Sequence, residues 1–133
     1  MIDRYARPQM KKVWSEENKN DKWLQVEIAV CEAWTDTGII PVEDMEKLRQ
    51  AQYNPDKIKE IFERTRHDMT AFLQSVTYGL GEEGRWLHHG LTTSDVWDTA
   101  TAMQLRDSAE LLLSEVDRLT EVLYSKASEY KNT

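Results

Sequence analysis

Apolar side chains recur every three or four residues along most of this chain, and this spacing places them on one face of an α-helix. The first run begins after Ser15, a residue type favoured at helix N-caps, and ends before Gly38, a type favoured where helices stop. Its apolar positions are Trp23, Val26, Val30, Ala33 and Trp34. The pattern therefore predicts one long amphipathic helix.

Three shorter helices are predicted in the middle of the chain. Pro41 opens one that runs through residue 52, and the dipeptide Asn54-Pro55 is a cap and first-turn signal for a second through residue 64. The periodicity breaks over residues 65–68, which predicts a loop. It resumes in a third helix at Met69, Phe72, Leu73 and Val76 and ends at Gly79.

The last part of the chain carries the longest apolar repeat. Residues 93–130 contain no Pro or Gly, and the apolar positions follow one another at steps of four or three: Leu105, Ala109, Leu112, Val116, Leu119, Leu123, Ala127 and Tyr130. Such a helix is about 60 Å long, at about 1.5 Å per residue, so it needs other helices to cover it. The repeat reaches Thr133 without a stop signal, so we expect the chain to continue. With no strand-type alternation, the predicted fold class is all-α.

Charge and composition exclude several classes of function. The 133 residues carry a formal net charge of −7, without a basic stripe, so we expect no nucleic-acid partner. No run of eighteen apolar residues and no signal-peptide core occur, which argues against a membrane span or export. Cys31 is the single cysteine and lies within a helical pattern, so a reducing cytoplasm is the expected location.

Polar residues concentrate in the stretch LHHGLTTSD, residues 87–95. Gly90 permits a sharp turn, and Thr92 or Thr93 stands at an N-cap position with Asp95 in the first helical turn. Free N–H groups at such a helix start, together with threonine hydroxyls, can bind a carboxylate or phosphate, although capping alone would also explain the residues. One of the adjacent histidines His88 and His89 can be structural, and the residues alone do not say which. No further His or Cys stands at a spacing typical of metal ligands, so the pair does not indicate a metal site.

Two further polar groups stand out. In TRHD, His67 lies between Arg66 and Asp68, and an aspartate beside an imidazole can orient it for acid/base work, although a lone His-Asp pair is common. In DRYARP, the guanidinium of Arg4 and the phenol of Tyr5 could close over a phosphate, unless this is only a frayed basic end.

Together, RYARPQM, TRHDM and LHHGLTTSDVWDTA resemble the motifs RYxxPEM, TxHDV and HxGLTSxDVxDTA of the adenylosuccinate lyase family in the fumarase/aspartase superfamily. The resemblance implies an N-terminal helical domain over residues 1–106 and the start of a long central bundle helix over 107–133. It implies elimination of fumarate from adenylosuccinate to give AMP, and from the succinylcarboxamide ribotide SAICAR to give AICAR. It implies no cofactor and no metal, and a homotetramer whose subunits share active sites.

The resemblance also implies roles for individual residues. Arg4 and Tyr5 would bind the nucleotide, and Arg66, His67 and Asp68 would line the site, with His67 assisting catalysis. His88 would be the family's histidine before Gly-Leu-Thr, and Thr92 and Thr93 would hold the succinyl carboxylates. The family's general acid and base would lie beyond Thr133, so we expect the isolated chain to be inactive.

This sequence departs from the family pattern mildly: His89 stands where an aromatic residue is usual, and Thr93 where serine is usual. Two alternatives remain. A sister lyase such as argininosuccinate lyase would use the same carboxylate-binding helix start, and a non-catalytic helical module would self-associate through the long helix.

Overall fold

The computed structural model describes residues 3–132, and every regular element in that range is helical. The predicted all-α class is thereby confirmed. The elements in chain order are η1 (Asp3–Tyr5), α1 (Pro8–Val13), α2 (Glu16–Asp36), α3 (Val42–Leu48), α4 (Pro55–Thr65), α5 (Asp68–Thr77), η2 (Glu82–Trp86) and α6 (Thr93–Glu129), where η marks a 3-10 helix.

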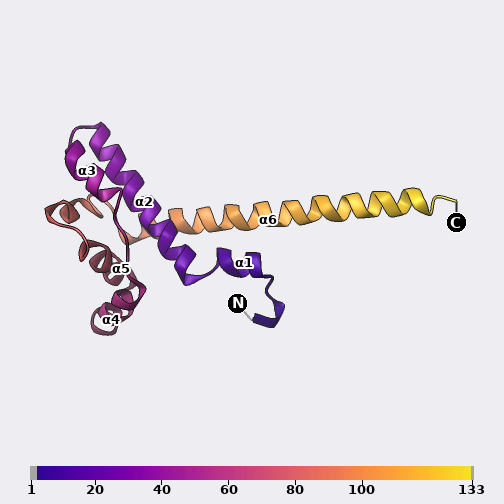
Figure 1. Ribbon diagram of the computed structural model, residues 1–133, viewed down its shortest axis with the longest axis horizontal. Coiled ribbons are helices and arrows are strands. Elements are labelled where there is room, and N and C mark those ends of the chain that lie inside the picture. The colour runs from indigo at the N-terminus through magenta and orange to yellow at the C-terminus, as the bar shows by residue number, and fades with distance from the viewer. Residues whose placement is uncertain (1–2, 133) are drawn as a thin grey trace.

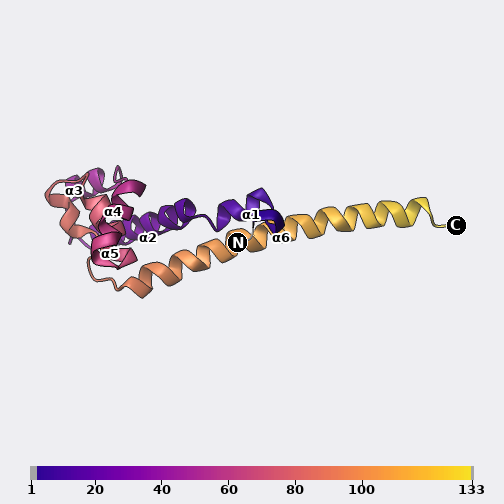
Figure 2. The ribbon, with the colours of Figure 1, turned by 90° about the horizontal axis from the view of Figure 1, so that it is seen from below.

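Figure 1 shows a compact head at one end of the molecule and a long single helix leading away from it. Helix α3 packs against α2, and α4 packs against α5, while α6 contacts α2 within the head and extends far past it. The turned view in Figure 2 shows α1 beside the middle of α6, and the two helices are in contact. The head therefore holds the core, and the far part of α6 stands alone in this chain.

The boundaries of α2 follow the predicted signals. The Ser15 hydroxyl accepts a hydrogen bond from the Asn18 N–H at 3.1 Å, so it is the N-cap. After the helix ends, Gly38 adopts a φ of +79°, a left-handed conformation that glycine takes without steric cost. Both end signals of this helix were correct.

The middle helices differ from prediction mainly at one end. α3 stops at Leu48 rather than residue 52, because bonds of the tighter i to i−3 type turn the chain and carry Ala51 into the core. The cap of α4 is as predicted: the Asn54 side-chain oxygen accepts the N–H groups of Asp56 and Lys57.

Three short elements, η1, α1 and η2, were not predicted. α1 buries none of its residues, so it leaves no apolar period to detect; it is held from outside by α6, whose Gln104 amide donates to the Val13 carbonyl at 2.7 Å. The η2 turn is fastened by the Glu83 carboxylate, which accepts the Gly81 N–H at 3.0 Å.

The core is centred on the Trp23 ring of α2. This ring meets Phe72 of α5 edge-on at 5.4 Å and Trp97 of α6 at 5.3 Å between centroids. On α6, buried side chains recur every four residues at Val96, Ala100, Gln104 and Ser108. Burial of this stripe attaches the first four turns of α6 to the head.

Beyond Ser108 no described residue of α6 is buried. The predicted apolar repeat from Leu105 to Tyr130 is on the surface here, including Leu112, Val116, Leu119 and Leu123 at 57% exposure or more. A large contiguous apolar face of this kind is typical of a helix that packs against partners. We call this exposed apolar face of α6, from Leu105 to Tyr130, the distal apolar stripe.

α6 runs without interruption through residues 106 and 107, so the division into domains 1–106 and 107–133 stays a prediction. Thr133, beyond which the general acid and base are expected, lies outside the described residues, as do residues 1–2. The expected continuation past Thr133 and the absence of both groups from this chain therefore also stay predictions. Within residues 3–132, no helix combines the length and the hydropathy that crossing a membrane requires.

Candidate active site

The loop between α4 and α5 presents the TRHD residues. Arg66 ends α4 in a left-handed conformation, with φ at 52°, and His67 follows as the N-cap of α5. The His67 Nδ1 accepts the Thr70 N–H at 3.2 Å. A nitrogen that accepts carries no proton, so the other ring nitrogen, Nε2, carries it and can donate to a ligand.

The orientation of His67 thus comes from a backbone N–H, and the structure shows no hydrogen bond between His67 and Asp68. The idea that Asp68 orients the ring is not supported by this geometry. Asp68 instead occupies the first turn of α5, where a carboxylate is favoured by the helix dipole.

The start of α6 is organised by Asp95. Its carboxylate accepts the Thr92 N–H at 2.7 Å and the Thr92 hydroxyl at 2.9 Å, so Thr92 is the N-cap and its hydroxyl is engaged. These two hydrogen bonds lower the pKa of Asp95, and the bond from the Thr92 backbone N–H has the larger effect. Thr93 is the first helical residue, so its N–H has no partner within the helix.

These two helix starts meet in one pocket. A hollow of about 190 Å³ is lined by Arg66, His67, Asp68, Met69, Thr93 and Trp97. It combines the guanidinium of Arg66, a donating imidazole and a threonine at a helix N-terminus, all suited to carboxylate or phosphate oxygens. Four of the predicted site residues, separated by some 25 positions in the chain, are therefore neighbours.

His88 is held differently from His67, by a buried carboxylate rather than by a backbone N–H, and the two adjacent histidines have different surroundings. The Glu27 carboxylate of α2 accepts the His88 backbone N–H at 2.7 Å and lies 2.7 Å from the ring Nδ1. The His89 ring instead lies between Trp34 and Trp86, with centroids at 5.7 and 5.9 Å. His89 therefore fills an aromatic position, which agrees with the aromatic residue that is usual there.

Arg4 and Tyr5 lie far from this pocket. The Arg4 guanidinium sits over the Tyr5 ring at 4.7 Å, and nearby Arg7 pairs with Glu115 of α6 at 2.6 Å. Glu115 comes about six turns after Thr93, roughly 33 Å along the helix. Within one chain, the structure does not bring the two N-terminal residues to the other predicted site residues.

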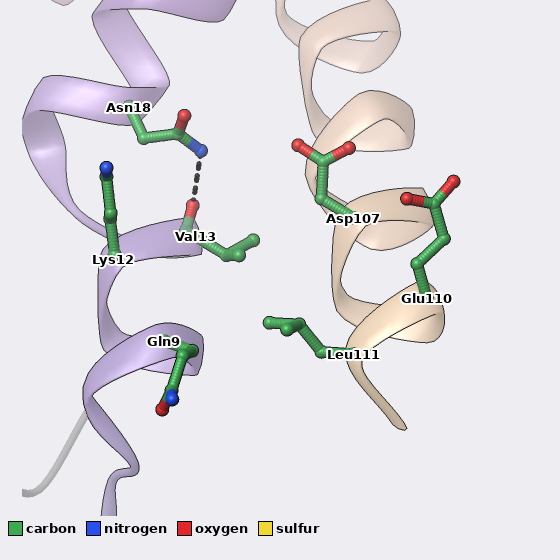
Figure 3. A pocket seen from close by; sticks show the side chains of 7 residues that line it. All are labelled: Gln9, Lys12, Val13, Asn18, Asp107, Glu110 and Leu111. Atoms are coloured by element: carbon green, nitrogen blue, oxygen red, sulfur yellow. Dashed lines mark hydrogen bonds between the residues drawn. The ribbon is translucent and has the colours of Figure 1, made fainter. Parts of the chain in front are cut away.

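A larger hollow of about 430 Å³ separates α1 from α6 and includes none of the predicted site residues. Figure 3 shows Val13 and Leu111 pointing into it from the two helices. Its carboxylate Asp107 is already paired with Lys22 at 2.8 Å. We assign this hollow no chemistry.

Sequence reasoning missed three residues of this region. Trp97 and Met69 line the pocket, but Met69 was assigned to the apolar face of a helix and no chemistry was assigned to Trp97. Glu27 had a detectable signal: it lies four residues after Trp23 and four before Cys31, on the buried face of α2. Among the described residues, no group of three or more His, Cys, Asp or Glu side chains could hold a metal ion.

Comparison with known proteins places this chain in a family. A family model described as "Lyase" matches residues 3–133, and the chain therefore belongs to this lyase family. It is 44% identical over 134 residues to the adenylosuccinate lyase of Bacillus subtilis (strain 168), an alignment that covers 100% of this chain and 31% of that protein. The resemblance drawn from the three motifs is thereby confirmed. The chain spans about a third of that relative's length.

The fold has a close counterpart among solved structures. A fumarate lyase from Mesorhizobium sp. BNC1 superposes with a TM-score of 0.84 over 93% of this chain and 30% of that chain, at 24% sequence identity. At this identity the likeness establishes the fold: an N-terminal helical unit followed by a long helix.

Proposed function

We propose that the protein containing this chain is an adenylosuccinate lyase, which eliminates fumarate from adenylosuccinate to give AMP and from SAICAR to give AICAR. The observation that carries the proposal is the pocket in which the TRHD loop meets the start of α6. Both substrates carry two succinyl carboxylates and a phosphate, and such groups need localised donors even on a chain of negative net charge.

Each predicted residue has a place in this proposal, and His88, in the loop that leads into α6, is a substrate-binding residue. Thr93, at the free N-terminus of α6, binds a succinyl carboxylate, and the exposed His67 donates through Nε2 and assists catalysis. Arg66 and Asp68 line the pocket. The Thr92 hydroxyl already donates to Asp95, so Thr92 contributes by capping α6 and thereby positioning Thr93. No cofactor takes part, and the general acid and base belong to the part of the protein beyond Thr133.

In this proposal Arg4 and Tyr5 contribute to the pocket of a neighbouring subunit rather than to the pocket of their own chain. The nearby Arg7 pairs with Glu115, roughly 33 Å along α6 from Thr93, so Arg4 and Tyr5 are too far away to contact one bound nucleotide together with Thr93. An assembly in which subunits share active sites would bring the N-terminal residues of one subunit to the pocket of another. The distal apolar stripe supports such an assembly, expected to be a homotetramer, because other helices would cover it.

The test is ultraviolet measurement of adenylosuccinate cleavage by the full gene product. We expect the wild type to cleave, His67→Ala to lower kcat/KM by about 100-fold or more, and Thr93→Val to lower it by about 10-fold. Thr37→Val is the matched control, because Thr37 is exposed at the end of α2, outside the pocket and away from the distal apolar stripe, and it should stay within about twofold. A folded wild type that cleaves another succinyl substrate instead would indicate a sister lyase. A folded wild type with no lyase activity would indicate a helical interaction module.

The assembly has its own test. Light scattering at tens of micromolar should give an oligomer for the wild type. The triple change Leu112→Ser, Val116→Ser and Leu119→Ser removes apolar side chains that are already exposed in the single chain, so it should shift the mass downward. A sharply monomeric wild type would contradict the proposal.

A further inference from the structure

Glu27 is the most deeply buried carboxylate described in the chain, at 1% exposure, and neither the fold nor the proposed chemistry accounts for it. Removing a carboxylate from water costs several kcal/mol unless partners replace the lost hydration. Glu27 lies on the core face of α2 beside Trp23 and Val26, where an apolar side chain would pack without that cost. Its presence therefore calls for a specific task.

Both oxygens of Glu27 are committed to one residue. Oε2 accepts the backbone N–H of His88 at 2.7 Å, and Oε1 faces the ring Nδ1 at 2.7 Å. No other ion pair of Glu27 is found among the described residues. A carboxylate that binds backbone and ring of the same residue controls where that residue's side chain points.

The His88 backbone needs such support. Its φ is 63°, one of two non-glycine residues described with positive φ, and a left-handed conformation costs a residue with a Cβ free energy. The conformation persists only if neighbours over-determine it, and the two bonds from Glu27 do so. They join α2 to the loop that leads into α6, across 61 positions of sequence.

The same contact selects the proton position on the ring. A carboxylate only accepts hydrogen bonds, so the Nδ1 that faces it carries a proton. Nε2 is then the ring nitrogen left for a ligand. The Leu91 N–H donates to the His88 carbonyl at 3.3 Å, and this turn leads directly into Thr92, the N-cap of α6, so His88 lies in the loop beside the helix start that includes Thr93.

We propose that Glu27 is a positioning residue for the lyase reaction: it holds the His88 backbone and ring so that Nε2 is presented to the succinyl substrate at the start of α6. This inference rests on the proposed function, because it takes His88 as a substrate-binding residue. Glu27 itself touches no substrate and acts only through His88.

Glutamine at position 27 is the sharpest probe, because it has nearly the same shape. Its amide oxygen still accepts the His88 backbone N–H, but its NH₂ group then faces Nδ1 and donates to it. The imidazole must move its proton to Nε2, which changes what that nitrogen offers a substrate. The substitution therefore preserves the packing around position 27 and changes His88 Nε2 from a hydrogen-bond acceptor to a donor.

The experiment measures adenylosuccinate cleavage and thermal unfolding of the full gene product as wild type, Glu27→Gln, His88→Ala and the double variant. The control is Glu32→Gln, which removes a carboxylate from the same helix, where it pairs with Arg49 at the surface. We expect E27Q to lower kcat/KM by about 10- to 100-fold, as loss of a ligand-orienting partner does elsewhere, and E32Q to stay within about twofold.

The double variant separates positioning from general stability. If Glu27 acts through His88, adding E27Q to His88→Ala lowers kcat/KM by less than about twofold more, because the ring it orients is gone. An equal loss in both backgrounds, tracking a lower unfolding temperature, would overturn the proposal. So would a single E27Q variant with unchanged kcat/KM.

A crystal structure of the Glu27→Ala full-length protein gives a readout that does not depend on activity. We expect the His88 ring to leave the position seen here and its φ to relax, and an unmoved ring would overturn the proposal. If the wild type proves unable to cleave adenylosuccinate, the proposed function fails, while the ring position still decides whether Glu27 orients His88.

Discussion

His67 and His88 both lie in loops that lead into helices, yet the structure holds them in opposite ways. The exposed His67 ring accepts a backbone N–H through Nδ1, so its proton is on Nε2. The His88 ring is only 22% exposed and faces a buried carboxylate through Nδ1, so its proton is on Nδ1. One residue type thus offers a ligand a donor in one loop and an acceptor in the other. The difference comes from the partner alone.

The difference in partners also predicts a difference in cost. A ring held by one backbone N–H can move at little expense, as suits a group that assists a reaction. A ring held by a buried carboxylate is tied to the core, because releasing it leaves a charge without a partner. Three measurements test this contrast.

The largest expected effect separates the two histidines by stability. His88→Ala leaves the Glu27 carboxylate buried without its ring partner and should lower the free energy of unfolding by about 3 kcal/mol. His67→Ala loses only an N-cap bond and should cost about 1 kcal/mol. Unfolding of the full gene product by increasing urea at one fixed protein concentration, followed by circular dichroism, measures both free energies. Equal losses would remove the contrast.

A smaller, pH-dependent effect is expected at Asp95. The Thr92 N–H and hydroxyl hold the pKa of this carboxyl below its ordinary 3.8. Because the folded pKa is lowered, the stabilisation is complete above the unfolded value and is lost as pH falls through the folded one.

Asp95→Asn should therefore lower the unfolding temperature at pH 7 and converge with the wild type as pH falls below about 4. Unfolding temperatures between pH 3 and pH 7 measure this. The matched control is Asp98→Asn, an exposed carboxylate of the same helix. A gap of constant size over the whole range would show that the Asp95 charge is not what stabilises the helix start.

The smallest effect is expected at His89, whose ring packs between two tryptophans and makes no charged contact among the described residues. Because the position is aromatic in character, His89→Tyr should change the free energy of unfolding by less than about 0.5 kcal/mol. The same unfolding experiment checks it. A loss comparable to that of His88→Ala would mean that both adjacent histidines are structural.

The fold could be predicted largely from local patterns, because they act within a few residues. Ser15, Gly38 and the Asn54-Pro55 pair marked helix boundaries through their own backbone preferences. α1 could not be found this way: it buries nothing of its own and depends on contacts from α6 that lie about a hundred positions away. The early end of α3 was missed for a related reason, since burial of Ala51 overrides helical propensity.

For the site, the sequence by itself determined the chemistry: three motifs rich in donors, a helix start able to bind anions, and membership in a lyase family. Only the tertiary structure decided which groups meet. It joined His67 to Thr93 in one pocket, kept Arg4 and Tyr5 away from it, and chose His88 over His89 as the partner of Glu27. The physical reason is range. Propensities and caps act over one helical turn, whereas the pairing of a buried carboxylate depends on how distant helices pack.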